Sequence, residues 1–306
     1  MTLREAIEEY LIDQVIRGNS GKTVIAYRYA LSYFLNFATD LPIEEVTLSL
    51  CRSYYIALHT RSLSTVTVQT YVRQLRAFLN WLFLEEKIRE NICKKFRLPK
   101  AERPTIDVLT DEEIGKIFET FPSESFLDVR NRAIIALFLD SGIRLSELVT
   151  IKKNYIHIPE RYVIVDGKGR KQRAVPFGNA ARDQLAHYAW HLPPDTRFFF
   201  LQENGSPITV TTMKDLFRDL KDRTQIERLH AHLLRHTFAT RYLENGGNIY
   251  ALQSILGHTS LEMVKRYLHL ATAQIHRDFV NFSPLDRYES VPSEGEKEGA
   301  GTLTEN

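Results

Sequence analysis

The sequence is short of cysteine and has no long apolar run. Its two cysteines, Cys51 and Cys93, lie in apolar segments of helical character, which argues against a disulfide framework and favours a reducing compartment. The longest apolar stretch, near residues 133–139, is too short to span a bilayer, and charged side chains interrupt the N-terminus where a signal peptide needs an apolar core. These absences predict a cytoplasmic protein without a membrane partner.

The chain also lacks a large excess of charge of either sign. Its 306 residues have a formal net charge of +2, and acidic residues are concentrated from Glu289 onward. The Glu, Gly, Pro and Ser content of residues 286–306 predicts a disordered acidic tail. Without that tail the remainder is modestly basic, which alone does not establish binding to nucleic acid.

The first third of the chain has the apolar periodicity of helices. It predicts helices over residues 2–17, 22–38, 47–59 and 64–86, the first opened by a capping box of Thr2 and Glu5. In the last of these helices the apolar positions are Tyr71, Leu75, Phe78, Leu79 and Leu82. A line of amide and guanidinium side chains lies on the other side: Gln69, Arg73, Arg76 and Asn80. Such a line is either an ordinary solvated face or a surface that contacts DNA bases and phosphates.

The remainder of the chain alternates between helical and strand patterns. Residues 99–107 read as a charged, extended linker, and a capping box of Thr110 and Glu113 opens the next domain. Residues 162–165 and 173–175 alternate as the strands of a hairpin around residues 166–169. Residues 198–201 predict a short buried strand, and helices are expected over residues 128–139, 179–191, 213–223 and 230–244. We therefore expect domains at 1–98 and 108–285.

The chemistry is concentrated near the C-terminus. His232 and Arg235 stand three positions apart, so a helix would aim both side chains toward one point. The arginine fork matches phosphate oxygens, and histidine transfers protons near neutral pH. Positive neighbours of Tyr267, including Lys265 and Arg266, would favour its phenolate, which can attack phosphorus. This pattern favours phosphoryl transfer.

A metal site is the alternative reading of the same segment. His232 and His236 have the spacing of a zinc pair on a helix. Leu233, however, occupies the place of the glutamate in the metalloprotease motif, and Arg235 would repel a metal ion. The sequence thus predicts no metal, and His236 is interpreted as a residue that packs its helix.

Five separate motifs resemble those of the tyrosine recombinase (lambda integrase) family, in the family's order. They are Arg144-Leu-Ser-Glu147-Leu, Gly167-Lys168-Gly169, His232-Leu-Leu-Arg235-His236, Leu256-Gly257-His258 and Tyr267-Leu-His269. The compact chain is similar to the Xer-like recombinases. The resemblance implies a mainly α protein with an N-terminal helical core-binding (SAM-like) domain and a mixed α/β catalytic domain with a small antiparallel sheet.

The resemblance also implies the roles of the site residues. Arg144 and Arg235 would bind the scissile phosphate, with Glu147 supporting Arg144. Tyr267 would attack to give a 3′-phosphotyrosine, His232 would accept and donate the proton, and His258 would hydrogen-bond to the phosphate. Lys168 would protonate the leaving 5′ oxygen, with Lys171 as the second candidate. No cofactor is implied.

The implied partner is a double-stranded DNA recombination site, and the protein is expected to be cytoplasmic and associated with the nucleoid. The family context favours DNA contacts by the line of side chains on helix 64–86 and by the hairpin residues Arg170, Lys171 and Arg173. Four copies, or copies with a paired recombinase, would assemble on two duplexes for dimer resolution, cointegrate resolution or integration. The alternatives are a type IB topoisomerase-like enzyme and a non-catalytic DNA-binding protein, which would have no need of Tyr267.

Overall fold

The computed structural model describes residues 1–61, 63–96, 107–167 and 172–257. The chain divides into two compact units, Met1–Arg103 and Pro104–Asn306. The division falls within residues 99–107, the segment expected to be a linker. The expected acidic tail at 286–306 lies outside the described residues.

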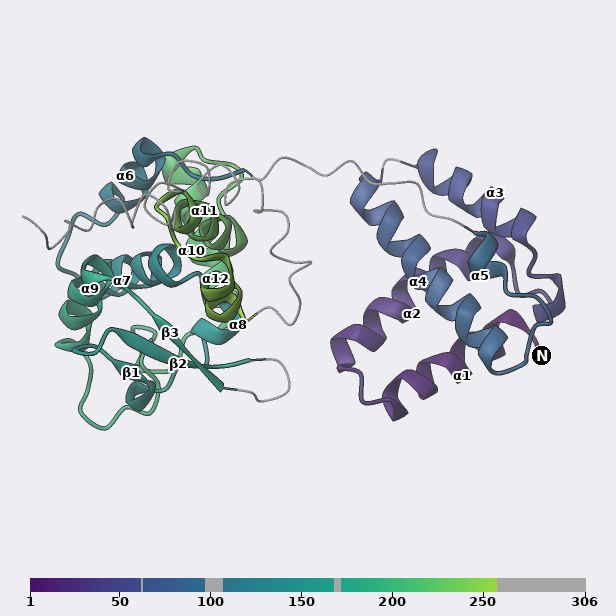
Figure 1. The fold of residues 1–306 in the computed structure, drawn as a ribbon, viewed down its shortest axis with the longest axis horizontal. Helices are drawn as coiled ribbons and strands as arrows, with labels where there is room; N and C mark the ends of the chain where they lie inside the picture. The colour runs from purple at the N-terminus through teal and green to yellow at the C-terminus, as the bar shows by residue number, and fades with distance from the viewer. Residues whose placement is uncertain (62, 97–106, 168–171, 258–306) are drawn as a thin grey trace, which may run out of the picture. The chain divides into compact units, whose positions relative to one another are not determined.

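The first unit is helical (Figure 1). Its described elements are α1 (Leu3–Ile16), α2 (Gly21–Ala38), the 3-10 turn η1 (Ile43–Glu45), α3 (Leu48–His59), α4 (Thr65–Leu84) and α5 (Ile92–Lys95). The four predicted helices are confirmed to within two residues at either end. The short helix α5 was not predicted, because four residues are too few to display a helical period.

Capping and burial explain these helices. At the start of α1 the hydroxyl of Thr2 accepts from the amide of Glu5, and the Glu5 carboxylate accepts from the amide of Thr2, as the capping box predicts. The apolar stripe of α4 is buried throughout, with Phe78 and Leu79 at 0% exposure. Full burial of such side chains stabilises the fold by roughly 1.5–3 kcal/mol each.

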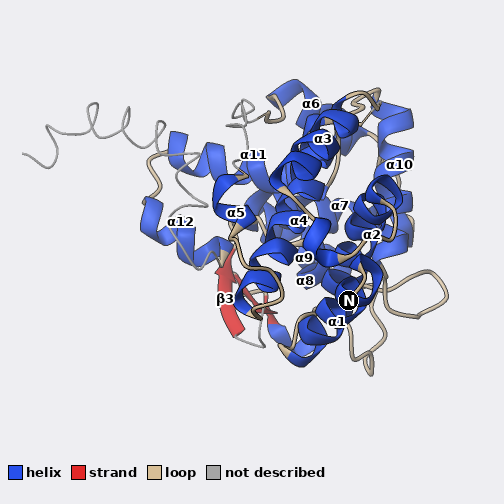
Figure 2. Cartoon of the chain, turned by 90° about the vertical axis from the view of Figure 1, so that its right-hand side faces the viewer, coloured by secondary structure: helices blue, strands red, loops and turns tan. Residues whose placement is uncertain are grey.

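The second unit combines helices with a small sheet (Figure 2). Its described elements are α6 (Asp111–Glu119), α7 (Phe126–Ser141), α8 (Leu145–Leu148), η2 (Lys153–Tyr155), β1 (Ile156–His157), β2 (Tyr162–Asp166), β3 (Gln172–Pro176), α9 (Asn179–Ala189), α10 (Val210–Thr224), α11 (Ala231–Glu244) and α12 (Ile249–Leu256). The strands pair antiparallel in the order β1-β2-β3, with Val163 opposite Val175. The predicted hairpin and the predicted mainly α fold class are confirmed.

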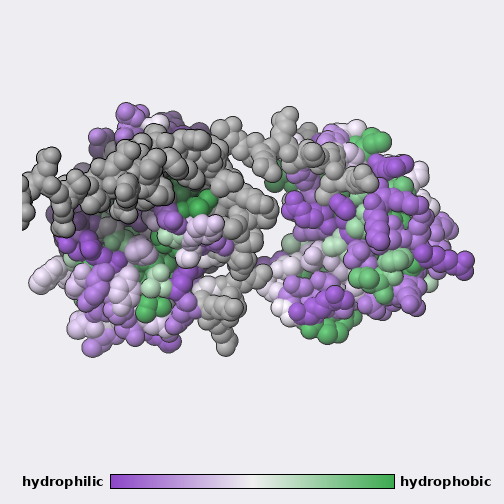
Figure 3. Space-filling view, viewed as in Figure 1, coloured by the Kyte–Doolittle hydropathy of each residue, from purple (hydrophilic) through white to green (hydrophobic). Residues whose placement is uncertain are grey.

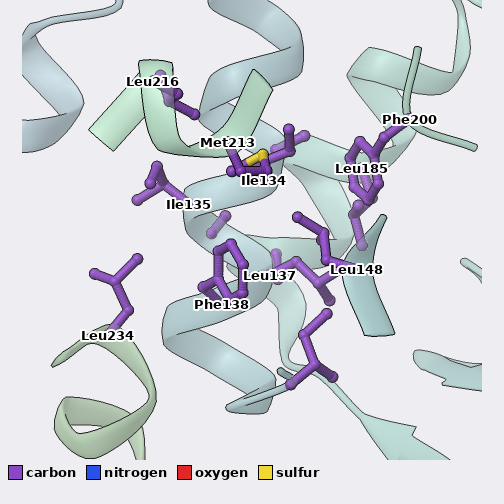
Figure 4. Close-up of a cluster of buried hydrophobic side chains, with 14 of the residues drawn as sticks. Ile134, Ile135, Leu137, Phe138, Leu148, Leu185, Phe200, Met213, Leu216 and Leu234 are labelled. Carbon is purple, nitrogen blue, oxygen red and sulfur yellow. The ribbon is translucent and has the colours of Figure 1, made fainter. Parts of the chain in front are cut away.

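Helix α7 is the centre of this unit's core. Its side chains are buried around the helix, and Figure 4 shows Ile134, Leu137 and Phe138 among apolar side chains from the surrounding elements. A helix that is apolar on every side must be enclosed, which the sequence of residues 128–139 anticipated. The position of the α7 C-terminus is therefore fixed by packing.

The predicted strand at residues 198–201 is wrong. These residues form only isolated bridges, between Lys152 and Phe198 and between Leu201 and Pro207. Proline has no amide hydrogen, so Pro207 cannot extend a ladder with its partner. The segment is nevertheless buried as expected, and the ring of Phe200 stacks on that of Tyr188 at a centroid distance of 5.6 Å.

The surface is mostly polar. On the face drawn in Figure 3, hydrophilic residues prevail on each unit and apolar residues form separate patches among them. Within the described ranges, no helix is both long and apolar enough to cross a membrane.

Candidate active site

Arg144 occupies the N-cap position of the short helix α8, directly after the end of α7. Helix α7 ends at Gly142, which adopts the left-handed conformation with φ of +60°. A Cβ atom at this glycine would lie 2.3 Å from the Phe238 ring, so both the backbone and the packing require glycine. The intervening Ile143 is fully buried. Arg144 is thus held on a rigid corner, as predicted.

Glu147 places a buried carboxylate beneath Arg144. It is 4% exposed and accepts from the Arg144 backbone amide at 2.8 Å and from Arg144 Nη1 at 3.0 Å. Burial raises the pKa of the Glu147 carboxyl, but hydrogen bonds from Arg173 and Arg144 outweigh burial and hold the pKa below its ordinary value. The carboxylate is therefore ionised at neutral pH.

Arg173 on β3 approaches the same carboxylate from the other side. Its Nη1 and Nη2 donate to the two Glu147 oxygens at 2.8 and 3.0 Å, and its Nε donates to the carbonyl of Ile255 at 2.8 Å. The side chain is 15% exposed. The contacts of Arg173 are thus within the protein, whereas the sequence predicted a contact to a DNA phosphate, which stays a prediction.

Arg235 on α11 is almost completely buried. Its side chain donates through Nη1 to the carbonyl of Gly142 at 2.5 Å and through Nη2 to the carbonyl of Leu256 at 2.8 Å. The neighbouring residues Leu234 and Phe238 anchor α11 in apolar clusters. This places Arg235 between the ends of α7 and α12.

The C-terminal end of α12 brings the three arginines together. Successive carbonyls of Ile255, Leu256 and Gly257 accept from Arg173, Arg235 and Arg144, the last through Nη2 at 3.3 Å. Figures 1 and 2 both draw α12 beside β3. The final carbonyls of a helix have no partners within it and carry its negative dipole end, so they attract and orient cations.

His232 lies in the first turn of α11 near these positive groups. Its side chain remains exposed to solvent, yet partial desolvation of the ring lowers its pKa, and the charges of Arg235, His230 and Arg144 lower it further. The imidazole is therefore neutral near pH 7 and able to accept a proton. The structure brings Arg144, Glu147 and Arg235 together at the end of α12, and His232 lies close enough for the charges of Arg144 and Arg235 to lower its pKa.

Several predicted site residues fall in segments that the structure leaves undescribed. They are Lys168, Arg170, Lys171, His258 and Tyr267. Among the described residues no cluster of His, Cys, Asp or Glu suits a metal ion, and His236 is partly buried on α11.

The predicted DNA-contact line on α4 is only partly exposed. Arg73 faces solvent, whereas Gln69, Arg76 and Asn80 are half-buried. Arg76 Nη2 donates to the carbonyl of Cys93 just after the start of α5, at 3.3 Å. Helix α5 packs against α4 and accounts for the burial of Arg76, while contact of these four residues with DNA stays a prediction.

The role of Arg173 was missed, although the sequence contained a signal for it. Alternate residues of a strand share a face, and Val175, two positions later, is a strongly apolar residue expected to point inward. In the structure Val175 is fully buried and Arg173 lies on the same side of β3. An inward-facing arginine requires a buried acceptor, and Glu147 is that acceptor.

Comparisons with known proteins identify the family. The phage integrase family model matches residues 107–274, and the phage integrase SAM-like domain matches residues 2–98. The tyrosine recombinase XerC of Bacillus pumilus is 30% identical over 289 residues, covering 90% of this chain and 94% of that protein. XerC of Staphylococcus carnosus is 32% identical over 243 residues, covering 78% and 82%.

Solved structures share the fold. The Tn1549 transposon integrase in complex with a circular intermediate DNA superposes with a TM-score of 0.73 at 22% identity, covering 90% of this chain and 99% of the other. A lambda integrase tetramer bound to a Holliday junction gives a TM-score of 0.69 at 20% identity, covering 85% and 78%. Motifs, site geometry and both family matches lead to one conclusion: the chain belongs to the phage integrase family and is a tyrosine recombinase, a DNA strand-exchange enzyme.

Proposed function

We propose that this chain cuts and rejoins double-stranded DNA at a specific recombination site through a 3′-phosphotyrosine bond to Tyr267. The observation that carries the proposal is the convergence of Arg144 and Arg235 on the carbonyls at the end of α12, with an ionised Glu147 beneath and His232 three residues before Arg235 on α11. Such a cluster of fixed donors suits a phosphodiester better than any neutral substrate.

The two arginines would grip the non-bridging oxygens of the scissile phosphate. Both guanidinium groups are oriented before substrate arrives, because helix-end carbonyls and Glu147 already hold them. Donors fixed in this way stabilise the charge that develops on phosphorus, and the loss of one costs about 100 to 1,000-fold in rate.

Tyr267, His232 and Lys168 would divide the remaining chemistry. The Tyr267 oxygen forms a bond to phosphorus and gives its proton to His232, whose lowered pKa keeps it neutral and ready to accept. The bond from phosphorus to the 5′ oxygen breaks, and Lys168 supplies the proton that this oxygen needs. His258 adds a hydrogen bond to the phosphate. Rejoining reverses these steps with a 5′ hydroxyl of the second duplex, so neither metal nor nucleotide is needed.

The larger assembly follows from the same proposal. Residues 1–98 would form a core-binding domain and 108–285 the catalytic domain, joined by a linker at 99–107 and followed by an acidic tail at 286–306. Arg73 on α4, together with Arg170 and Lys171, would bind the DNA backbone. The lambda integrase tetramer on a Holliday junction supports assembly of four copies, or of copies with a paired recombinase. The enzyme would act in the cytoplasm on nucleoid DNA.

The test is incubation with a nicked suicide duplex that carries the recombination site. Wild-type protein should form an SDS-resistant adduct that maps to Tyr267, and Tyr267→Phe should abolish the adduct while DNA binding is retained. Tyr250→Phe, which changes an exposed tyrosine of α12, is the matched control and should keep the adduct. An adduct formed by Tyr267→Phe would disprove the assignment of the nucleophile.

A second assay separates recombination from topoisomerase-like activity. Two labelled duplexes that each carry the site should yield exchanged products through a Holliday junction. Relaxation of supercoiled DNA without exchanged products would favour the type IB alternative.

A further inference from the structure

Glu147 divides one carboxylate between two arginines. Its Oε1 accepts from Nη1 of both Arg144 and Arg173, and its Oε2 accepts from the Arg144 amide and from Arg173 Nη2. Arg173 therefore has the two-pronged contact, and the Arg144 side chain has a single one. We propose that Arg173 is a positioning residue for strand exchange: it occupies the Glu147 carboxylate and so keeps Arg144 available for the substrate phosphate.

The donors of Arg144 support this role. A guanidinium has five N–H donors. Arg144 uses one on Glu147 and one on the carbonyl of Gly257, and its side chain is 30% exposed. Because Arg173 already covers both carboxylate oxygens, Arg144 cannot turn its own fork onto them without displacing it. The remaining donors of Arg144 are left to face the substrate.

The charges lead to the same result. Without Arg173, the buried Glu147 would pair with Arg144 alone, and the positive charge of Arg144 would be neutralised where the phosphate must bind. With Arg173 present, the three groups together keep one net positive charge. Opposite charges this close interact strongly in a partly buried site, so Arg144 would be drawn toward an otherwise unpaired carboxylate.

The contacts of Arg173 distinguish positioning from direct contact with DNA. Each of its three side-chain nitrogens donates to an acceptor within the protein, namely the two Glu147 oxygens and the carbonyl of Ile255. A residue that bound phosphate through the same nitrogens would have to give up these bonds. The inference rests on the proposed function, because it concerns the reaction in which Arg144 binds the scissile phosphate.

The first experiment compares two readouts for Arg173→Gln in the full-length protein. The single-turnover rate of adduct formation on the suicide duplex should fall about 100-fold, the loss expected when a preorganised donor is misplaced. The dependence of DNA affinity on salt should not change. A phosphate contact would instead lower the slope of log affinity against log salt concentration by about 0.9. Arg182→Gln, which removes an exposed arginine paired with Asp183, is the control for loss of one charge.

The second experiment asks for rescue. In the double variant Glu147→Gln/Arg173→Gln the carboxylate that captures Arg144 is gone, so adduct formation should recover at least about tenfold relative to Arg173→Gln. Recovery of the rate without a matching rise in the free energy of unfolding would separate release of Arg144 from general repair of the core, because Glu147→Gln also removes a buried charge that has lost its partner. If Arg173→Gln fails to fold, Arg173→Lys provides the test. Lysine keeps the positive charge but lacks the two-pronged guanidinium, so adduct formation should slow while the salt dependence of DNA affinity stays unchanged.

The outcomes separate the two proposals. If wild-type protein forms no adduct at Tyr267, the proposed function fails. If wild type forms the adduct, three results would overturn the role of Arg173: an unchanged rate in its variants, a salt slope reduced by about 0.9, or no recovery in the double variant.

Discussion

The guanidinium of Arg173 lies where a side chain at position 257 would have to be placed. A Cβ atom on Gly257 would come within 2.8 Å of Arg173 Cζ, and the glycine has a φ of +63°. The two residues belong to different elements, β3 and the end of α12, and both contribute to the arginine cluster. Because Gly257 has no side chain, the guanidinium of Arg173 can lie against it.

Gly257→Ala should slow adduct formation by about tenfold or more, because the methyl group displaces Arg173 from Glu147 and from the Ile255 carbonyl. It should also cost about 1 kcal/mol of stability for the left-handed backbone. Gly205→Ala is the matched control, since Gly205 also has positive φ but no atom lies within 4 Å of the place its Cβ would take. Equal activity of the two variants, measured on the suicide duplex, would contradict this prediction.

His232 should titrate below the ordinary histidine pKa of about 6.5 in the DNA-free protein. Arg144→Ala should raise its pKa, because the Arg144 charge is one cause of the shift, whereas Arg182→Ala should not. A lowered folded pKa means that the unfolded chain binds the proton more readily. Protonation of His232 therefore destabilises the fold as pH falls below about 6.5. NMR titration of the His232 ring measures the pKa, and a value above 6.5 would refute the prediction.

Glu147→Gln should destabilise the protein by about 3 kcal/mol at neutral pH, because it leaves two guanidinium groups without their buried carboxylate. The folded pKa of Glu147 is lowered, so its contribution is present above the ordinary value of about 4.3 and is lost as pH falls through the folded pKa. Urea unfolding at pH 7 and below pH 4 should show a large difference between wild type and variant that shrinks in acid. The control variant is Glu227→Gln, at an exposed glutamate. Its free energy of unfolding should stay within about 0.5 kcal/mol of the wild-type value at both pH values.

Arg73→Ala and Arg76→Ala should behave differently. Arg73 is exposed, so its loss should lower the salt slope of DNA binding by about 0.9 and leave stability unchanged. Arg76 is half-buried and donates a hydrogen bond to the carbonyl of Cys93. Loss of this bond in Arg76→Ala should cost about 1 kcal/mol of stability. Binding isotherms over a salt series, together with thermal unfolding, measure both. An unaltered slope for Arg73→Ala would return α4 to an ordinary solvated face.

Much of the fold follows from local patterns in the sequence. The capping boxes at Thr2 and Thr110 and the stripe on α4 predict where helices begin and which side is buried, because both depend on residues three or four apart. The hairpin follows from alternation in the same way. Arg144 and Glu147 form an ion pair, the contact that the family resemblance implied.

Long-range contacts to the backbone could not be predicted. Arg235 and Arg144 bind carbonyls at the end of α12, and a carbonyl is present in every residue whatever its side chain. Which carbonyl accepts the hydrogen bond of each arginine depends on how α7, α11 and α12 pack. The contact of Arg76 with Cys93 was missed for a related reason, since it needs a helix of four residues that has no visible period.

Helix α12 has only eight residues; its buried side chains Leu252 and Leu256 lie in a small cluster with α11, and its Ile255 packs against the core around α7. A helix this short does not persist without its packing, and proteins open locally in such cooperative pieces. Fraying of this helix would remove one carbonyl acceptor from each of three guanidinium groups at once, although Glu147 and the Gly142 carbonyl would keep their own bonds to them. The enzyme can therefore lose its competence to react on warming well before most of its architecture melts.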